Sequence, residues 1–279
     1  MELQLDLDFS PEQVNLLDMH SLLNILTVVQ HQLLHMSDCT RNPAKLFEMA
    51  DGMAAAAAAL PQAEAAERLL AQLDDLIQAV QSSLIQIAET DLIPKEAATW
   101  QEAQANLTGI FEILKLRARE LRQRRDSPLG WRAHSAASLR KNFGQVFAAI
   151  ERNSHGAYRI VDNMADLDQE DYLVLFDIKA NEKGELLMPP VFQDVMRDLL
   201  ANARKYTPPG GTILGGVCVR DNELRFVVED SGCGIPPGEI ESVVRFGYRA
   251  SNVQHRPTKG GGFGLTKAYY VTKAHGGRM

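Results

Sequence analysis

The distribution of glycine divides this 279-residue chain into two parts with different requirements. Of its 20 glycines, only five lie in the first 180 residues, and the other fifteen lie between Gly184 and Gly277. Glycine weakens helix interiors and serves turns and loops that approach a ligand closely. We therefore expect a long helical part followed by a compact domain rich in turns and loops, in a chain long enough for about two domains.

Composition and charge exclude several classes of protein. Hydrophobic residues make up 45% and charged residues 23% of the chain, as in ordinary globular proteins rather than disordered ones. The net charge of -7 argues against general nucleic-acid binding. No apolar run reaches the roughly 20 residues that span a bilayer, and the acidic N-terminus does not read as a signal peptide. Three scattered cysteines exclude a disulfide framework or zinc site, so we expect a cytoplasmic protein.

The first part is predicted to be helical throughout. One helix is expected over residues 10–36, where a capping box begins at Ser10. Its apolar residues cover most of its surface, so several neighbours should bury it in a bundle. A polar stripe should face solvent or a partner, and it comprises His20, Asn24, Thr27, His31 and His35. Further helices are expected over residues 43–60, 61–90, 94–125 and 134–167. The basic residues at 115–125 fit an acidic-partner patch or, more simply, a solvated helix end.

The second part alternates strands, a helix and glycine-rich loops. Residues 172–178, 212–220 and 223–229 are rich in β-forming residues, and Asp221-Asn222 should turn the last two into a hairpin. A turn is expected at 181–184 and a helix over 191–206. The order predicts an α+β chain, with an all-helical bundle stem followed by a compact α/β domain.

Four clusters in the second part suit the binding of a Mg²⁺–polyphosphate group. The first lies on one face of the predicted helix and comprises Asp198, Asn202, Lys205 and Tyr206. Its carboxylate, amide and ammonium groups suit Mg²⁺ shared with phosphates. The second is Asp230-Ser-Gly232-Cys-Gly234-Ile235, the third is Phe246-Gly-Tyr248-Arg249, and the fourth is Gly260-Gly-Gly262-Phe-Gly264-Leu265. The backbone N–H groups of the fourth, and the helix that follows, could cradle a polyphosphate.

In this order and spacing the clusters resemble the N, G1, F and G2 boxes of the histidine-kinase-like ATPase superfamily, the Bergerat or GHKL fold. The matching segments are DLLANARKYT, DSGCGIP, RFGYRAS and GGGFGLTKAYYVTKAHGG, within residues 194–277. KYT and HGG are more similar to sensor histidine kinases of two-component systems than to gyrase, chaperone or mismatch-repair relatives. The resemblance implies an α/β-sandwich ATP-binding domain over residues 169–279.

The resemblance also implies a role for each matched position at the phosphate end. Asn202 would bind Mg²⁺, and Lys205 would approach the phosphates of ATP. A lid would span residues 239–262, with Arg249 or Lys259 near the γ-phosphate. The other nucleotide-binding residues of this region would be Gly260, Gly262, Gly264 and Leu265. Asp198 replaces the usual Asn or Glu; it could orient water or metal, but gyrase-like hydrolysis is not implied.

At the adenine end, the resemblance implies that Tyr206 would lie along the base. Asp230 would accept a hydrogen bond from the exocyclic amine of adenine. Gly232, Gly234 and Ile235 would shape the base pocket.

His20 is the expected phosphoacceptor. The segment His20-Ser-Leu-Leu-Asn24-Ile-Leu-Thr-Val-Val resembles an H box that reads HDFNNILTVI. His20 would attack the γ-phosphate through a neutral ring nitrogen. Asn24 matches the position that helps to dephosphorylate the partner regulator. Ser21 stands where the family has Asp or Glu, so a plain surface histidine is the alternative.

The resemblance implies the domain boundaries. The chain departs from the family pattern in its N-terminal part and again at its C-terminus. Residues 1–168 would form a dimerisation and histidine-phosphotransfer-like stem, with a helical insertion at about 37–131 and a second stem helix within 146–167. The insertion could thicken a homodimer, which is favoured, or cap the stem and hold the chain monomeric. Family members continue past HGG with two strands, so the ATP-binding domain is expected to be truncated at Met279.

These expectations combine into an ATP- and Mg²⁺-dependent histidine kinase that phosphorylates itself on His20 and passes the phosphoryl group to a response-regulator aspartate. Two alternatives stay open. One is a degenerate ATP-binding and docking module without autokinase activity. The other is a serine kinase of the anti-sigma-factor kind.

Overall fold

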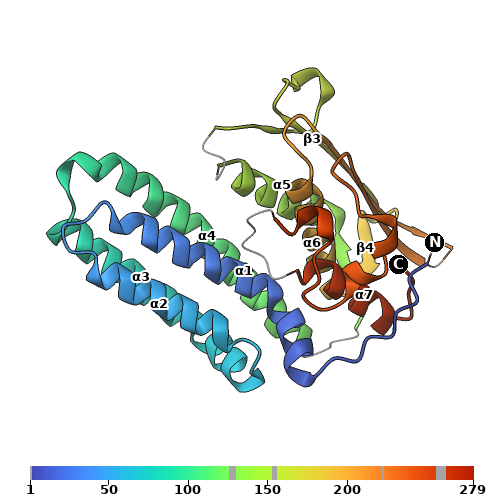
Figure 1. Cartoon of the computed structure of the whole chain (residues 1–279), viewed down its shortest axis with the longest axis horizontal. Coiled ribbons are helices and arrows are strands. Elements are labelled where there is room, and N and C mark those ends of the chain that lie inside the picture. The colour runs from blue at the N-terminus through green and yellow to red at the C-terminus, as the bar shows by residue number, and fades with distance from the viewer. Residues whose placement is uncertain (1, 126–129, 153–155, 222, 256–261) are drawn as a thin grey trace. The chain divides into compact units, whose positions relative to one another are not determined.

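The computed structural model describes residues 2–125, 130–152, 156–221, 223–255 and 262–279 (Figure 1). The chain divides into two compact units. The helical unit lies within residues 7–126, and the α/β unit is built mainly from residues 127–279 together with residues 1–6.

Four long helices build the helical unit: α1 (Pro11–Ser37), α2 (Ala44–Ala59), α3 (Ala63–Thr90) and α4 (Ala97–Arg125). Helix α1 packs against α2, α4 and, less extensively, α3. One apolar core runs through all four helices and includes Leu22, Leu26, Leu73 and Trp100. The predicted bundle is therefore confirmed, and α1 is buried by helices of its own chain.

Hydrogen bonds between loops fix the alternating direction of these helices. At one end, the backbone N–H of Arg41 donates to the Asp91 carbonyl at 2.8 Å, which joins the α1–α2 loop to the end of α3. At the other end, Asn15 Nδ2 of α1 donates to the Leu60 carbonyl at 2.5 Å, beyond the end of α2. Because the connections alternate between two ends, consecutive helices run antiparallel.

The α/β unit is built around a four-stranded sheet in the order β2-β3-β5-β6. The strands are β2 (Ile160–Val161), β3 (Tyr172–Lys179), β5 (Thr212–Arg220) and β6 (Glu223–Asp230). β3 is parallel to both β2 and β5, whereas β5 and β6 form the predicted antiparallel hairpin. Asp221 turns this hairpin with φ of 51°, a left-handed conformation that aspartate tolerates better than most residues. A separate antiparallel pair joins β1 (Arg132–Ser135) to β4 (Glu185–Met188).

Three helices complete the α/β unit: α5 (Ala136–Arg152), α6 (Val191–Tyr206) and α7 (Gly264–Ala274). Apolar side chains of α5 and α6 share one core with β3 and β5, which includes Phe143, Leu200, Val174 and Ile213. Short 3₁₀ turns lie at Pro94–Glu96, Met164–Asp166, Pro237–Glu239, Ser242–Val244 and Ser251–Val253.

Residues 2–6 belong to the α/β unit although the helical unit follows them in sequence. The Leu3 N–H donates to the Met279 carbonyl at 2.9 Å. The Tyr269 hydroxyl lies 3.2 Å from the Leu3 carbonyl and 2.8 Å from the Leu5 carbonyl. The start of the chain is thus attached to α7 and to the residues that follow it.

The region 130–168 differs from the expected long helix over 134–167. β1 occupies residues 132–135, and α5 ends at Arg152. Gly156 adopts φ of +80°, which a continuing helix does not allow. Moreover, α5 packs on the sheet, whereas the sequence analysis placed it in the stem. The helices that surround α1 come from the segment expected to be an insertion.

Among the described residues, none of the helices combines the length and the apolar character needed to cross a membrane.

We expect Leu26→Ala to lower the free energy of unfolding of the helical unit by about 2–5 kcal/mol, because Leu26 is fully buried in the bundle core. Val28→Ala is the matched control on the same helix, since Val28 is 36% exposed and should change stability by less than about 0.5 kcal/mol. Urea denaturation followed by far-UV circular dichroism measures both. Equal effects of the two substitutions would contradict this packing of α1.

Candidate functional site

Helices α6 and α7 bring Asn202 against the glycine-rich segment. A Cβ atom built on Gly264 would lie 2.8 Å from Asn202 Nδ2, so a side chain at position 264 would displace the Asn202 amide. Gly264 is the first residue of α7, whose free backbone N–H groups attract anions. Leu265 follows it in the same helix turn. The structure thus joins the first and fourth clusters of the sequence analysis.

Lys205 and Arg249 give this region positive charge. Burial and, secondly, the nearby charge of Arg249 lower the pKa of the Lys205 ammonium below its ordinary value of 10.5. Lys205 Nζ also lies 5.2 Å from the centroid of the Tyr206 ring, within cation–π range. Arg249 donates a hydrogen bond to the Val253 carbonyl at 2.8 Å, which anchors its side chain. A polyanion beside these two cations would relieve their mutual repulsion.

Asp230 is held in a fixed orientation at the end of β6. Its Oδ1 accepts hydrogen bonds from the Gly232 N–H at 2.9 Å and from Thr207 Oγ1 at 3.5 Å. A Cβ atom on Gly232 would lie 2.5 Å from Asp230 Oδ1 and 2.7 Å from the Tyr206 carbonyl, so a side chain would not fit. The carboxylate keeps capacity to accept further hydrogen bonds.

Next to this carboxylate, Gly234 adopts φ of +64°. Ile235 follows it and exposes 41% of its apolar side chain. The structure therefore places the expected adenine-binding residues Tyr206, Asp230, Gly232, Gly234 and Ile235 around the ends of α6 and β6.

Glu239 organises the first half of the expected lid. The sequence had predicted the lid but not this role of Glu239. It accepts hydrogen bonds from the Tyr248 hydroxyl at 2.8 Å, from the Ser251 N–H at 2.9 Å and from the Ser251 hydroxyl. These bonds lower the pKa of the Glu239 carboxyl, and the one from Tyr248 raises the pKa of that hydroxyl. Asn252 Nδ2 donates to the Gly234 carbonyl at 3.0 Å, which ties this segment to the loop after Asp230.

The second half of the lid is described only in part. Lys259 and Gly260 lie outside the described residues. Gly262 adopts φ of +78°, and a Cβ atom there would approach the Tyr248 carbonyl to 3.0 Å. Gly262 therefore meets the same segment that Glu239 organises.

Asp198 and Lys267 form an ion pair that sequence reasoning missed. Lys267 Nζ lies 3.8 Å from Asp198 Oδ2, and the lysine side chain is only 1% exposed. A lysine among the apolar residues of α7 was a signal that it has a buried carboxylate partner, and Asp198 departs from the usual residue at its position. Asp198 is thus engaged by a cation of the protein.

In the helical unit, His20 and Asn24 lie one turn apart on α1. Asn24 Nδ2 lies 3.2 Å from His20 Nε2. Because an amide nitrogen only donates, this contact is a hydrogen bond in the tautomer that carries its ring hydrogen on Nδ1. His20 is buried, whereas His31 and His35 of the same predicted stripe are exposed. The Ser21 hydroxyl makes no hydrogen bond within the described part of the chain, so it does not orient His20.

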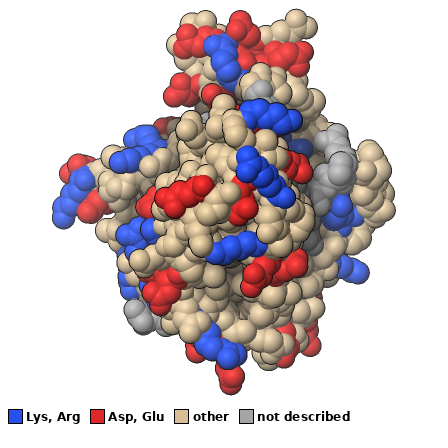
Figure 2. All heavy atoms as spheres, turned by 90° about the vertical axis from the view of Figure 1, so that its left-hand side faces the viewer, with Lys and Arg blue, Asp and Glu red and all other residues tan. Residues whose placement is uncertain are grey.

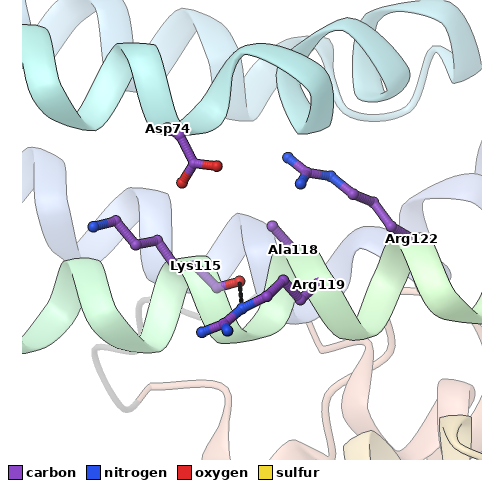
Figure 3. A pocket seen from close by; sticks show the side chains of 5 residues that line it. All are labelled: Asp74, Lys115, Ala118, Arg119 and Arg122. Carbon is purple, nitrogen blue, oxygen red and sulfur yellow. Dashed lines mark hydrogen bonds between the residues drawn. The ribbon is translucent and has the colours of Figure 1, made fainter.

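A hollow of about 300 Å³ lies between α3 and α4, lined by Asp74, Lys115, Ala118, Arg119 and Arg122 (Figure 3). Its cations already contact oxygen atoms of the protein. Arg122 donates to the Leu70 carbonyl, Arg119 Nε to the Lys115 carbonyl at 3.4 Å, and Lys115 Nζ lies 3.3 Å from Glu112 Oε1.

Acidic and basic side chains are interspersed on the face that Figure 2 shows. On helix α4 itself, Arg119 and Arg122 are exposed, but Arg117 and Arg124 are buried. The basic segment 115–125 is thus only in part the solvated helix end expected from the sequence, and Arg117 pairs with Glu120 at 2.7 Å.

Comparison with known proteins decides the nature of the α/β unit. Residues 189–279, from the start of α6 through α7, match the family "Histidine kinase-, DNA gyrase B-, and HSP90-like ATPase". This segment is an ATPase domain of that family. The match includes every described residue of the four clusters, so the resemblance seen in the sequence is confirmed.

Relatives of the ATPase domain are sensor kinases. The sensor histidine kinase WalK of Bacillus subtilis is 36% identical over 85 residues, 30% of this chain and 14% of WalK. The adaptive-response sensory kinase SasA of Synechococcus elongatus is 27% identical over 188 residues, 65% of this chain and 46% of SasA. The chain thus spans less than half the length of these relatives. An alignment with the structure of the mycobacterial sensor histidine kinase MprB covers 52% of this chain and 82% of MprB. The sequence identity is 20% and the TM-score is 0.36.

We expect Arg249→Gln to raise the pKa of Lys205 without fully restoring its ordinary value, since burial, the larger cause, remains. A ¹³C NMR titration of the lysine side chains measures the change, with Arg225→Gln on β6 as the control. An unchanged pKa of Lys205 would contradict the proximity of the two cations.

The pKa shift also fixes a pH dependence. The folded-state pKa of Lys205 lies below that of the unfolded chain, so the unfolded chain binds more protons between the two values. The contribution of Lys205 to the free energy of unfolding therefore rises with pH between its folded-state pKa and about 10.5. Arg249→Gln should raise the folded-state pKa and so narrow this pH interval.

Proposed function

We propose that the chain is an ATP-dependent protein histidine kinase of a two-component system, in which the ATPase domain phosphorylates His20. The single observation that carries the proposal is the ATPase-family site, with Asn202, Lys205 and Asp230 in place, in a chain that also carries His20 in an H-box-like helix. The names of the two relatives described above, a sensor histidine kinase and a sensory kinase, support the same reaction class.

Adenine would bind at the end of β6. The Asp230 carboxylate, oriented by the Gly232 N–H, would accept a hydrogen bond from the exocyclic amine. Glycine at 232 leaves room for a flat base beside the Tyr206 carbonyl. Asp230 would thus recognise the base and take no part in phosphoryl transfer.

The triphosphate would bind between Lys205, Arg249 and the start of α7. The two cations and the backbone N–H groups after Gly262 provide positive charge and hydrogen-bond donors. The amide oxygen of Asn202 would hold Mg²⁺, which prefers oxygen ligands and neutralises phosphate charge when bound. The residues present fit such a group, and their contribution is to position and neutralise the phosphates.

His20 would act as nucleophile through Nε2. Its lone pair would form the N–P bond, while the bond between the γ-phosphorus and the bridging oxygen breaks and its electron pair leaves with ADP. His20 is buried, and Asn24 Nδ2 lies 3.2 Å from its Nε2. Before the attack, His20 would have to become exposed and Asn24 would have to release Nε2. The phosphoryl group would then pass to the carboxylate of a response-regulator aspartate, which regenerates the imidazole.

The wider proposal includes a cytoplasmic location and a homodimer through the helical unit. Helix α1 is already buried by its own chain, so a homodimer would have to use outer faces of the bundle. A second candidate function, an ATP-binding module without autokinase activity, is favoured by Ser21, which makes no hydrogen bond among the described residues.

The decisive measurement is incubation with γ-labelled Mg·ATP. We expect an acid-labile, base-stable label on the protein, lost at least about 100-fold in His20→Ala, because removing the attacking group abolishes the acceptor. His31→Ala, an exposed histidine on the same helix, is the matched control and should keep the label. Absence of label despite ATP binding would favour the autokinase-deficient module, and an acid-stable label would favour a serine kinase.

Nucleotide binding is tested separately through Asp230. We expect Asp230→Ala to weaken ATP binding about 10–100-fold, the effect of losing a charge-assisted hydrogen bond. Asp177→Ala, an exposed carboxylate on β3, should leave the affinity unchanged. Isothermal titration calorimetry measures both, and equal affinity of Asp230→Ala and wild type would overturn the assignment of the base site.

A further inference from the structure

Lys267 is a buried lysine of α7 held by two carboxylates of α6. Its Nζ lies 3.2 Å from Asp194 Oδ2 and 3.8 Å from Asp198 Oδ2. Asp194 Oδ1 also accepts a hydrogen bond from Arg197. The exposed fractions of these side chains are 1% for Lys267, 3% for Asp194, 12% for Asp198 and 8% for Arg197. A charge this deeply buried requires such partners, since burying it alone would cost several kcal/mol.

The two helices meet in successive layers. Asp194, Asp198 and Asn202 lie at intervals of four residues and so share one face of α6. Gly264 contacts Asn202, and Lys267, one turn later, contacts Asp198 and Asp194. In the next layer, Val191 and Val195 of α6 pack with Ala268 and Val271 of α7. On α6 the ion pairs therefore lie one turn (Asp198) and two turns (Asp194) from Asn202.

We propose that Lys267 is a positioning residue of the nucleotide site. By holding Asp194 and Asp198, it fixes the first turn of α7 against Asn202, so that phosphate-binding N–H groups and the Mg²⁺-binding amide keep their spacing. This inference rests on the proposed function of the site. It also gives Asp198 a different role from the water- or metal-orienting one expected from its sequence position, because its carboxylate serves Lys267.

The geometry separates the two ends of the nucleotide site. Asp230 and Gly232 contact Tyr206 and Thr207, at the C-terminal end of α6, and are fixed by hydrogen bonds that do not involve α7. Loss of Lys267 should therefore weaken binding of the triphosphate and spare binding of the base. A general loss of structure would weaken both.

The experiment compares affinities for Mg·ATP and for AMP in the full chain. In Lys267→Met we expect Mg·ATP to bind about 10–100-fold more weakly, the usual effect of removing a supporting partner, while AMP affinity stays within about twofold. Lys267→Arg should recover part of the Mg·ATP affinity. Lys273→Met, an exposed lysine of the same helix, should match wild type.

Because Lys267→Met leaves this cluster with one more carboxylate than cations, a second variant adds Asp198→Asn alone, so that Asp194 keeps its ion pair with Arg197. We expect this double variant to fold, by circular dichroism, and still to bind Mg·ATP weakly and AMP normally. Wild-type Mg·ATP affinity in either folded variant, or an equal loss for Mg·ATP and AMP, would overturn the inference. Failure of the wild-type protein itself to bind Mg·ATP would instead overturn the proposed function, and the inference with it.

Discussion

A charged lysine is costly to bury unless opposite charge lies close to it, and the contact between α6 and α7 meets this condition. Asp194 and Asp198 supply that charge for Lys267, at 3.2 and 3.8 Å. Between the same two helices, Gly264 lies against Asn202, and a Cβ atom on Gly264 would lie 2.8 Å from Asn202 Nδ2. Lys205 lies on the last turn of the same α6 helix, whereas Asp230 of β6 is held by hydrogen bonds from Thr207 and the Gly232 N–H.

Sequence patterns revealed those parts of the fold that local signals determine. Prolines near residues 43, 61 and 94 mark helix starts, because proline suits the first helical turn, and α2, α3 and α4 begin within three residues of them. Asp221 marks the β5–β6 hairpin because it can adopt positive φ. The antiparallel pair β1–β4 had no such signal, since its partners are separated by about 50 residues and pair only in the folded chain. The expected helix over 134–167 was wrong beyond Arg152, although Gly156 was a local signal against it.

In the candidate site, motif residues were predictable but their supports were not. Asn202, Asp230 and the glycines stand out because few other residue types allow the contacts they make. Glu239 and Lys267 act by binding side chains from other segments, at distances that no sequence spacing encodes. The sequence motifs included their partners Tyr248 and Asp198, but the motifs alone suggested that both side chains face the nucleotide.

The attachment of residues 2–6 to Tyr269 and Met279 has a consequence for the order of folding. The hydrogen bond from Tyr269 to Leu3 spans 266 positions in sequence, whereas the helical unit closes its core with residues between 7 and 126. Contacts between distant segments form late because chain entropy must be lost before they are made. During synthesis the bundle can therefore assemble while the ATPase domain is still being made. Residues 2–6 must therefore wait for α7 and Met279 before their contacts are complete.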